Sequence, residues 1–476
     1  MSEMYLQCEY PVAYMWQARK FFGVEATGTF PGSYLDAIVA TMLNTGDTAW
    51  ILVSTALVML MLPGLALFYG GLVRTKNVLS TFMHSFVVLG LVALQWAVYG
   101  YSLAYGPDHG GLVGGLSFAF MRGIELAPRQ GDGIPHLLFF AYQMMFAIIT
   151  PALISGAYAE RLKFSAFVLF TLLWSTLIYD PLCHWVWGYG GWMAKLGVLD
   201  FAGGLVVHVS SGVSALVVAL VVGKRLGYPR ERSLPHNMTM VLLGAGVLWF
   251  GWFGFNGGSA LGASGTAALA LVNSQLAAAA GGMAWLLVDV LRYRKASALG
   301  FASGLVAGLA TVTPASGFVG PLGATAIGLC AGLICYAAVA LKGRFGYDDT
   351  LDAFGVHGVG GAVGTILLGV FAAKIWNPGG ADGLLAGGVG FLARQAMAVL
   401  VTAGFSALGT LVILKGVDAV VGLRVTADEE REGLDINLHG EDGYAFGSST
   451  LGQADGGAAA SGDALLAAPS HAVPAA

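Results

Sequence analysis

The stretch AWILVSTALVMLMLPGLALFYGGL, residues 49–72, is predominantly apolar and carries no charged side chain. A helix needs about 20 such residues to cross the hydrocarbon core of a bilayer. Runs of similar length and composition recur almost to the end of the chain. The fold therefore follows from how many of these runs there are and from how they are oriented.

The composition agrees with a membrane protein. Of the 476 residues, 57% are hydrophobic and only 11% are charged, against about 25% charged residues in an ordinary soluble domain. The mean hydropathy is +0.74. We predict an all-α polytopic membrane protein with eleven transmembrane helices, over residues 49–72, 78–105, 136–159, 164–187, 201–222, 239–258, 266–291, 299–317, 321–341, 354–374 and 384–415.

Positive charges on the connecting segments predict the orientation, because Lys and Arg accumulate in cytoplasmic loops. The loops after the first, third, fifth, seventh and ninth runs hold thirteen Lys and Arg residues, whereas the opposite loops hold four. We therefore expect a multi-pass protein of the cell membrane with its N-terminus outside and its C-terminus inside.

The chain is expected to have four parts. Residues 1–46 lack a span-length apolar run and are interpreted as an extracytoplasmic leader or extension. Residues 47–415 form the membrane domain, residues 416–447 a cytoplasmic C-terminal region, and residues 448–476 a disordered tail rich in Ala, Gly and Ser. The net charge of -4 gives no indication of a nucleic-acid partner.

Two stretches five spans apart resemble each other, which predicts an internal repeat. The first run ends with LFYGG (residues 67–71) and the sixth ends with GFNGG (residues 254–258). Units separated by five crossings face opposite ways, so we expect two inverted five-helix repeats followed by a long final helix. Folds of this kind place their pathway between the repeats, near the bilayer midplane.

Two histidines in equivalent runs are candidate functional residues. His208 follows Asp200 by eight residues, and His357 follows Asp352 by five. An ionisable side chain within a membrane is costly unless it is paired or faces a cavity. A neutral imidazole offers one N–H donor and one bare nitrogen, which suits a narrow route for a small polar molecule or a proton. The alternative is that both are core histidines bonded to backbone carbonyls.

The two aspartates, Asp200 and Asp352, stand where their helices are expected to begin. A carboxylate in this position can accept hydrogen bonds from free N–H groups and is favoured by the helix dipole. We therefore expect both to be N-terminal caps. For Asp200, the alternative is electrostatic stabilisation of a cation without direct contact.

Aromatic side chains lie at the centres or ends of the same runs. An aromatic face attracts a cation by about 0.5 to 2 kcal/mol, but Trp and Tyr at the membrane interface also anchor helices. Both interpretations stay open for Tyr142, Phe146, Trp187, Trp252 and Phe255.

No motif indicates an enzyme. The histidines His184, His208 and His357 lie on separate runs, and the chain has neither HExxH nor a dense cluster of histidines. No GxSxG motif or P-loop occurs in a suitable context. We therefore expect no catalytic residues, no metal and no cofactor.

Six short stretches together carry a resemblance to a known family. They are PGLALFYGGLVRTKNVLS (63–80), AYAERLKFSAF (157–167), HWVWGYGGW (184–192), LDFAGGLVVH (199–208), GWFGFNGGSA (251–260) and FGVHGVGG (354–361). In this order, and on eleven runs, they resemble the ammonium transporter family, the Amt/Mep branch of the Amt/Mep/Rh superfamily. The resemblance extends from Asp47 to Tyr444.

The resemblance implies a homotrimer with one hydrophobic pore per subunit, which conducts ammonium into the cytoplasm. It also implies roles for individual residues. The outer recruitment site is Tyr142, Phe146, Trp187 and Ser259; the gate is Phe146 and Phe255; the pore residues are Trp252, His208 and His357; and Asp200 is the acidic residue near the recruitment site. Tyr142 stands where many relatives have Phe.

The chemistry of this set suits an ammonium ion. Aromatic rings offer cation-π faces, and Ser259 offers an acceptor oxygen for an N–H that potassium lacks. The ion is expected to lose a proton as it enters the dry pore, because a bare cation there is costly, and to cross as ammonia. Whether the proton follows along the histidines, which would make transport electrogenic, stays open.

The C-terminal stretch VGLRVTADEEREGLDINLHGEDGY, residues 421–444, also resembles the family. In relatives this region packs under neighbouring subunits and takes part in docking a PII-type nitrogen regulatory protein. The partners implied are therefore ammonium or ammonia, two further copies of the chain, the lipid bilayer and a PII-type protein. Two other functions are compatible with the sequence, an ammonium sensor and a pore for another small neutral molecule.

Overall fold

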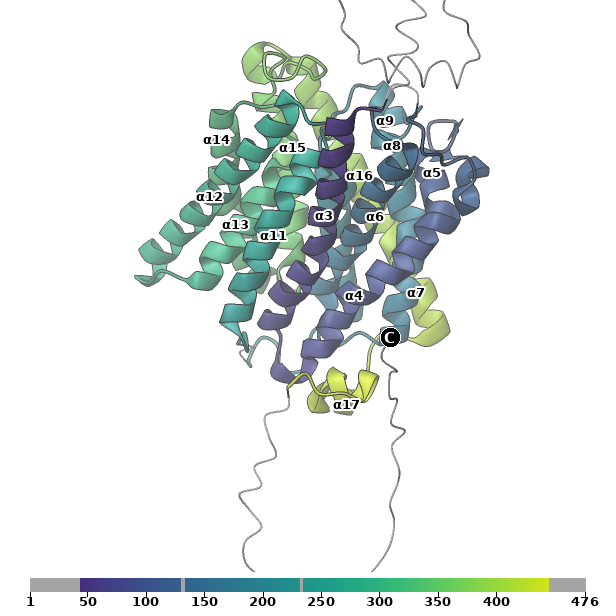
Figure 1. Ribbon diagram of the computed structural model, residues 1–476. Coiled ribbons are helices and arrows are strands. Elements are labelled where there is room, and N and C mark those ends of the chain that lie inside the picture. Colours follow the sequence, from purple (N-terminus) through teal and green to yellow (C-terminus); the bar gives the residue numbers. More distant parts are fainter. Residues whose placement is uncertain (1–42, 130–132, 232–233, 445–476) are drawn as a thin grey trace, which may run out of the picture.

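The computed structural model describes residues 43–129, 133–231 and 234–444, which form a bundle of helices (Figure 1). In this part of the chain, ten helical segments are long and apolar enough to cross a membrane, and an eleventh, α13 (Ala298–Val312), is apolar but has only 15 residues. All eleven apolar runs therefore form helices. The predictions for the leader before residue 43 and for the tail after residue 444 lie outside the described residues.

In the first half of the bundle, three of the spans change from α-helix to π-helix along their length. The spans are α3 (Thr45–Leu72); α4 (Val78–Gln95), η2 (Trp96–Gly100) and α5 (Tyr101–Tyr105); α6 (His136–Tyr158); α7 (Phe164–Trp174), η4 (Ser175–Tyr179) and α8 (Asp180–Trp187); and η5 (Gly204–Val209) with α10 (Ser210–Val222). The connections include η1 (Thr75–Asn77), η3 (Leu116–Met121), α9 (Trp192–Lys195) and a hairpin of the antiparallel strands β1 (Asp108–His109) and β2 (Val113–Gly114).

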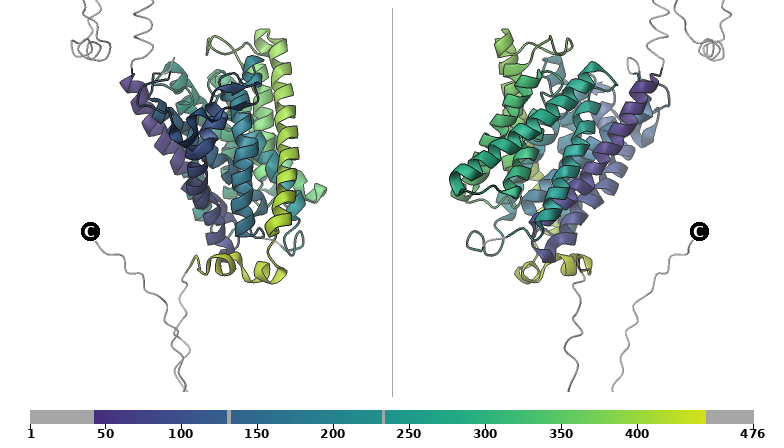
Figure 2. Two further views of the ribbon diagram at one scale, coloured as in Figure 1. Left: turned by 90° about the vertical axis from the view of Figure 1, so that its right-hand side faces the viewer. Right: turned by 60° about the vertical axis from the view of Figure 1, so that its left-hand side comes forward.

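The second half also has five spans and adds a long final helix at one side of the bundle (Figure 2). Its spans are α11 (Met238–Gly258), α12 (Gly265–Tyr293), α13, α14 (Pro321–Phe345), η6 (Phe354–Gly358) with α15 (Val359–Phe371), and, after η7 (Leu384–Ala386), α16 (Val389–Val421). The C-terminal region then forms α17 (Ala427–Glu432) and η8 (Asp435–His439).

Equivalent elements of the two halves pack on each other. The first span of each half, α3 and α11, lie along one another. The fifth spans cross so closely that a Cβ on Gly212 would lie 2.0 Å from the backbone nitrogen of Gly358, and a Cβ on Gly361 would lie 2.7 Å from the carbonyl oxygen of Gly204. Small residues allow helices to approach in this way within a membrane. Gly212 and Gly361 each follow a candidate histidine by four residues.

The start of α3 and the C-terminal α17 lie at opposite ends of the bundle (Figure 1). Near α17, the basic loops after the first, third, fifth and ninth runs meet. Arg74 and Arg225 both pair with Glu160, and Arg225 also pairs with Asp348. This grouping of basic loops agrees with the charge pattern of the sequence, whereas the side of the membrane on which they lie stays a prediction.

Two expected boundaries are wrong. The eighth run was expected to be helical over residues 299–317, but α13 ends at Val312 and buried turns follow. The side-chain amide of Asn273 donates to the carbonyls of Ser316 and Val319. These backbone oxygens therefore have hydrogen-bond partners although the helix has ended. The last run was expected to end at residue 415, but α16 continues to Val421 and is followed by Gly422, which has a φ of 71°.

Candidate functional site

Three cavities follow one another through the bundle between the two halves. The outer cavity, named after the predicted orientation, has a volume of about 390 Å³, the middle cavity about 20 Å³ and the inner cavity about 190 Å³. The outer and middle cavities are separated by two phenyl rings. The middle and inner cavities share Phe68, Tyr69, Val306 and His357 in their walls.

The outer cavity brings together three of the four residues expected to recruit a cation. The cavity is lined by Phe146 on α6, Trp187 at the end of α8 and Ser259 after α11. Asp200 and Arg129 also line it. The rings of Phe146 and Trp187 meet edge to face, 5.9 Å between centroids. These residues come from distant parts of the chain, and the fold brings them into the wall of one cavity.

Tyr142 lies behind the outer cavity rather than in its wall. The side chain is buried, and its hydroxyl lies 2.9 Å from the carbonyl oxygen of Phe255 and 3.3 Å from the hydroxyl of Ser259. The Ser259 hydroxyl in turn donates to the same Phe255 carbonyl over 2.8 Å. The extra hydroxyl of Tyr142 thus fixes Ser259 in place.

Gln143 is a residue that sequence reasoning missed. It lines the outer cavity, and its side-chain oxygen is buried without a hydrogen-bond partner in the described part of the chain. An unpaired acceptor of this kind is costly unless a ligand or water supplies a donor. The only signal for Gln143 in the sequence is its position directly after Tyr142. A single glutamine among aromatic residues forms no recognisable motif.

Phe146 and Phe255 form the boundary between the outer and middle cavities. Their ring centroids lie 4.4 Å apart with an angle of 36° between the planes. Phe146 faces the outer cavity and Phe255 faces the middle one. The pair expected to act as a gate is therefore in contact, and the passage is closed at this point.

His208 and His357 lie side by side in the wall of the middle cavity, with their Nδ1 atoms toward each other. Their rings are nearly parallel, at 13°, and their Nδ1 atoms lie 3.3 Å apart. One Nδ1 must carry the proton that the other accepts, so the pair shares one hydrogen bond. The alternative, in which each histidine is satisfied by a backbone carbonyl, does not agree with this contact. The two Nδ1 atoms bond to each other, and Nε2 of His208 is buried without a partner in the described residues.

Trp252 completes the apolar wall beside the histidines. Its ring is stacked on that of His208, with centroids 5.7 Å apart, and its indole N–H donates to the hydroxyl of Thr313 over 3.0 Å. It also packs on Phe255. These contacts fix the ring next to the middle cavity.

Asp200 is an N-terminal cap, as expected. Its two carboxylate oxygens accept hydrogen bonds from the backbone N–H groups of residues 203 to 206, over 2.6 to 3.2 Å. They thereby satisfy the start of the π-helix that carries His208. The backbone carbonyl of Asp200 also accepts the indole N–H of Trp187, over 2.8 Å. One residue thus fixes both the recruitment aromatic and the histidine helix.

Asp352 is not a cap, and this prediction is wrong. Its φ is 62°, a left-handed conformation, and its carboxylate forms an ion pair with Lys342 on α14. The cap is Asp349, whose two oxygens accept from the backbone N–H groups of Ala353 and Phe354, over 3.2 and 2.8 Å. Asp349 precedes His357 by eight residues, as Asp200 precedes His208. The signal that could have found Asp349 is this spacing.

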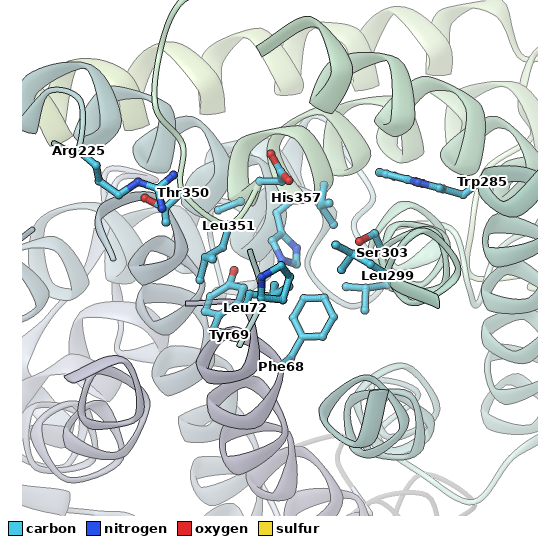
Figure 3. A pocket seen from close by; sticks show the side chains of 15 residues that line it. Phe68, Tyr69, Leu72, Arg225, Trp285, Leu299, Ser303, Thr350, Leu351 and His357 are labelled. Carbon is cyan, nitrogen blue, oxygen red and sulfur yellow. The ribbon is translucent and has the colours of Figure 1, made fainter. Parts of the chain in front are cut away.

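The inner cavity lies next to His357, among apolar side chains such as Phe68 and Leu351 and a few polar ones such as Ser303 and Thr350 (Figure 3). Arg225 lies at its edge, where its guanidinium bonds Asp348 twice and Glu160 once. Burial alone would raise the pKa of Glu160, but Arg225 and Arg74 lower it below its usual range. The inner end is therefore an ionic network, in contrast to the aromatic outer cavity.

Together these features define a multi-pass membrane protein whose inverted halves meet at a row of cavities. Known proteins identify the family. A model described as the Ammonium Transporter Family matches residues 49–444. An ammonium transporter of Bacillus subtilis is 49% identical over 404 residues, covering 84% of this chain and 99% of that protein.

Further relatives extend the likeness to other organisms and to a solved structure. The ammonium transporter Amt1 of Archaeoglobus fulgidus is 47% identical and covers 84% of this chain and 100% of that protein. The crystal structure of Saccharomyces cerevisiae Mep2 superposes with a TM-score of 0.77 at 37% identity, covering 83% of this chain and 91% of that chain. The chain belongs to the ammonium transporter family.

Proposed function

We propose that the protein recruits ammonium in the outer cavity and that the ion gives up its proton as it passes the phenyl pair, either back to water of the outer cavity or on to the histidine pair. Ammonia then passes along the twin histidines into the cytoplasm. The observation that carries this proposal is the row of cavities, with an aromatic cavity outside, a small apolar cavity in the middle and an inner cavity that has Arg225 and Asp352 in its wall. Each part suits one step of the transfer.

Recruitment uses a small set of groups around one ion. The faces of Phe146 and Trp187 attract a cation, and the oxygens of Ser259 and Gln143 accept its N–H hydrogens. Potassium gains the aromatic attraction but has no N–H to donate. The set therefore favours ammonium over potassium by its hydrogen bonds.

Passage through the middle cavity requires loss of the proton. The cavity holds about 20 Å³ and has mostly apolar walls, so an ion would enter almost without water. An unpaired charge in such surroundings is far more costly than a neutral molecule. Ammonia can bond the histidine pair on its way, as donor or as acceptor.

The protein acts as a homotrimer regulated at its C-terminal region, in the same proposal. The regulatory part of this proposal is supported by contacts of the C-terminal region with η1 and the start of α4. The carboxylate of Asp435 accepts from the N–H groups of Leu79 and Ser80, and the N–H of Leu434 donates to Asn77. A PII-type protein that binds this region can therefore act on the start of α4.

Currents in proteoliposomes test the proposal. An ammonium jump and a potassium jump are applied to the purified protein while an internal dye reports pH. We expect a response, electrical or by pH, to ammonium but not to potassium. The Trp187→Leu variant is expected to raise the half-saturating ammonium concentration, whereas the control Trp376→Leu, at a tryptophan 46% exposed in the loop after α15, is expected to leave it unchanged. Absence of any ammonium-dependent response in the wild type would refute the proposal.

A further inference from the structure

His184 lies one turn before Trp187 on α8, and both nitrogens of its ring face oxygen atoms. Its Nδ1 is 2.9 Å from the backbone oxygen of Ala104, and its Nε2 is 3.0 Å from Oδ1 of Asp108. A backbone carbonyl can only accept, so Nδ1 must carry a proton. An ionised carboxylate also only accepts, so Nε2 must carry one as well. The ring with both protons is an imidazolium.

Asp108 is held in its ionised form by several donors. Besides His184, the backbone N–H of Gly111 donates to it over 2.6 Å, and the ammonium group of Lys195 lies 3.3 Å away. The bond from His184 contributes most, and together these donors lower the pKa of Asp108 to about 2. The carboxylate is therefore an acceptor at neutral pH, as the protonation of His184 requires.

The surrounding backbone leaves room for this pair. His184 is fully buried, and a Cβ on Gly188 would lie 2.5 Å from its Nδ1. Gly190 has a φ of 90°, and a Cβ there would lie 2.5 Å from the Cβ of Asp108. Both glycines belong to the stretch HWVWGYGGW, and close approach to the two side chains explains these two positions.

The pair connects the outer hairpin to the end of α8 that carries Trp187. The neighbouring Trp185 donates its indole N–H to the carbonyl of Leu112 in the same hairpin, over 2.7 Å. On its other side, Trp187 donates to the carbonyl of Asp200. The last turn of α8 is therefore fixed by the hairpin and by Asp200 together.

We propose that His184, as an imidazolium paired with Asp108, is a positioning residue that holds Trp187 for ammonium recruitment. The inference rests on the recruiting role proposed for Trp187. Loss of either ring proton breaks one of the two bonds, so recruitment weakens as the outer pH rises. Charged or titratable groups lie on the elements packed around α8. They are Asp108 and His109 on β1, Lys195 on α9, Tyr101 and Tyr105 on α5, Tyr179 on η4, His208 on η5, and Asp180 and Cys183 on α8 itself.

The test measures the half-saturating ammonium concentration of the full chain in proteoliposomes at a series of outer pH values between about 5.5 and 8. In the wild type we expect this concentration to rise with pH by about fivefold or more, since bonds to charged groups are strong. His184→Gln is expected to show the high value at every pH. Asp108→Asn keeps an acceptor oxygen but not the charge, so its rise is expected at lower pH than in the wild type.

Two further variants separate the possible outcomes. His109→Gln alters an exposed histidine on the same hairpin and is expected to keep the wild-type profile. Trp187→Leu is expected to show a raised concentration at every pH. If His184→Gln keeps the wild-type profile, or Asp108→Asn rises at the same pH as the wild type, the positioning role is wrong while the recruiting role of Trp187 stands. If Trp187→Leu has no effect, the recruiting role fails and the inference fails with it.

Discussion

The two halves of the molecule present their histidines in the same way but in different surroundings. In each half, an aspartate eight residues before the histidine accepts the first N–H groups of a π-helix. Asp200 accepts four such bonds beside an aromatic cavity. Asp349 accepts two, within a network that includes Lys342 and Asp352.

This difference shows that the same aspartate cap on a π-helix occurs in two different environments. The outer copy must hold both the histidine helix and Trp187, and its carboxylate carries all four bonds. The inner copy lies among other charges that share the work of fixing the backbone; Lys342, for example, donates to the backbone oxygen of Asp349 over 2.7 Å. We therefore expect substitution of Asp200, the outer cap, to reduce transport strongly. We expect the stability contributed by Asp349, the inner cap, to depend on pH.

The largest expected effect is that of replacing the outer cap. Asp200→Asn turns an NH₂ group toward backbone N–H groups, so at least two bonds are lost. Because hydrogen bonds to charged groups contribute about 1.5–3 kcal/mol each, we expect ammonium-evoked flux to fall by at least about tenfold. Asp349→Asn is expected to cost about threefold, since fewer bonds depend on it. Equal or greater loss in Asp349→Asn would break the comparison.

The second prediction concerns pH and the stability of the inner half. Burial raises the pKa of Asp349 from 3.8 to about 6, with Lys342 opposing and Asp352 adding to the rise. The native state therefore binds the proton more tightly than the unfolded state, and this contribution is complete below about pH 4 and lost as pH rises through about 6. A shift of this size corresponds to about 3 kcal/mol.

Thermal unfolding in detergent, compared between the wild type and Asp349→Asn, measures this contribution. The variant cannot titrate at this position, and all other groups are common to both proteins. The unfolding temperature of the wild type minus that of the variant is expected to fall between about pH 4 and 6 and to be constant above. A difference that rises with pH over this range would mean that the carboxylate is favoured in the native state.

The smallest expected effect is that of Lys342→Met. The ammonium group pairs with Asp352, whose side chain is 34% exposed and can be hydrated when the partner is removed. Partly exposed ion pairs contribute about 1 kcal/mol or less, so we expect a small loss of stability at neutral pH and flux within about twofold of the wild type. The fall in the unfolding-temperature difference should move to higher pH, since Lys342 lowers the pKa of Asp349. An unchanged position of this fall would show that the two residues are not coupled.

The spans and the histidine pair could be predicted from the sequence, because long apolar runs and intramembrane ionisable residues are local signals. The inner cap could not be predicted as easily. The letters Leu351 and Asp352 imitate Leu199 and Asp200, which favoured the wrong aspartate. The left-handed backbone of Asp352 and its ion pair with Lys342 keep its carboxylate away from the helix start. Both features depend on the folded structure.

The outer cavity shows a second limit of sequence reasoning. Phe146, Trp187 and Ser259 were expected together and all line it, whereas Tyr142 lies behind and Gln143 beside them. Neighbouring residues on a helix face different directions, and the faces can be assigned only when the packing of α6 is known. The resemblance to relatives supplied the list of recruitment residues. The structure shows which of these side chains face the outer cavity.

The central claim is that ammonia passes along the histidine pair in the middle of the bundle. Its most direct test is the ammonium jump in proteoliposomes containing the His208→Leu and His357→Leu double variant, with potassium as control and an internal pH dye. The account predicts that ammonium-dependent flux is lost or that its selectivity over potassium disappears, while the protein still folds. Flux and selectivity equal to those of the wild type would contradict it.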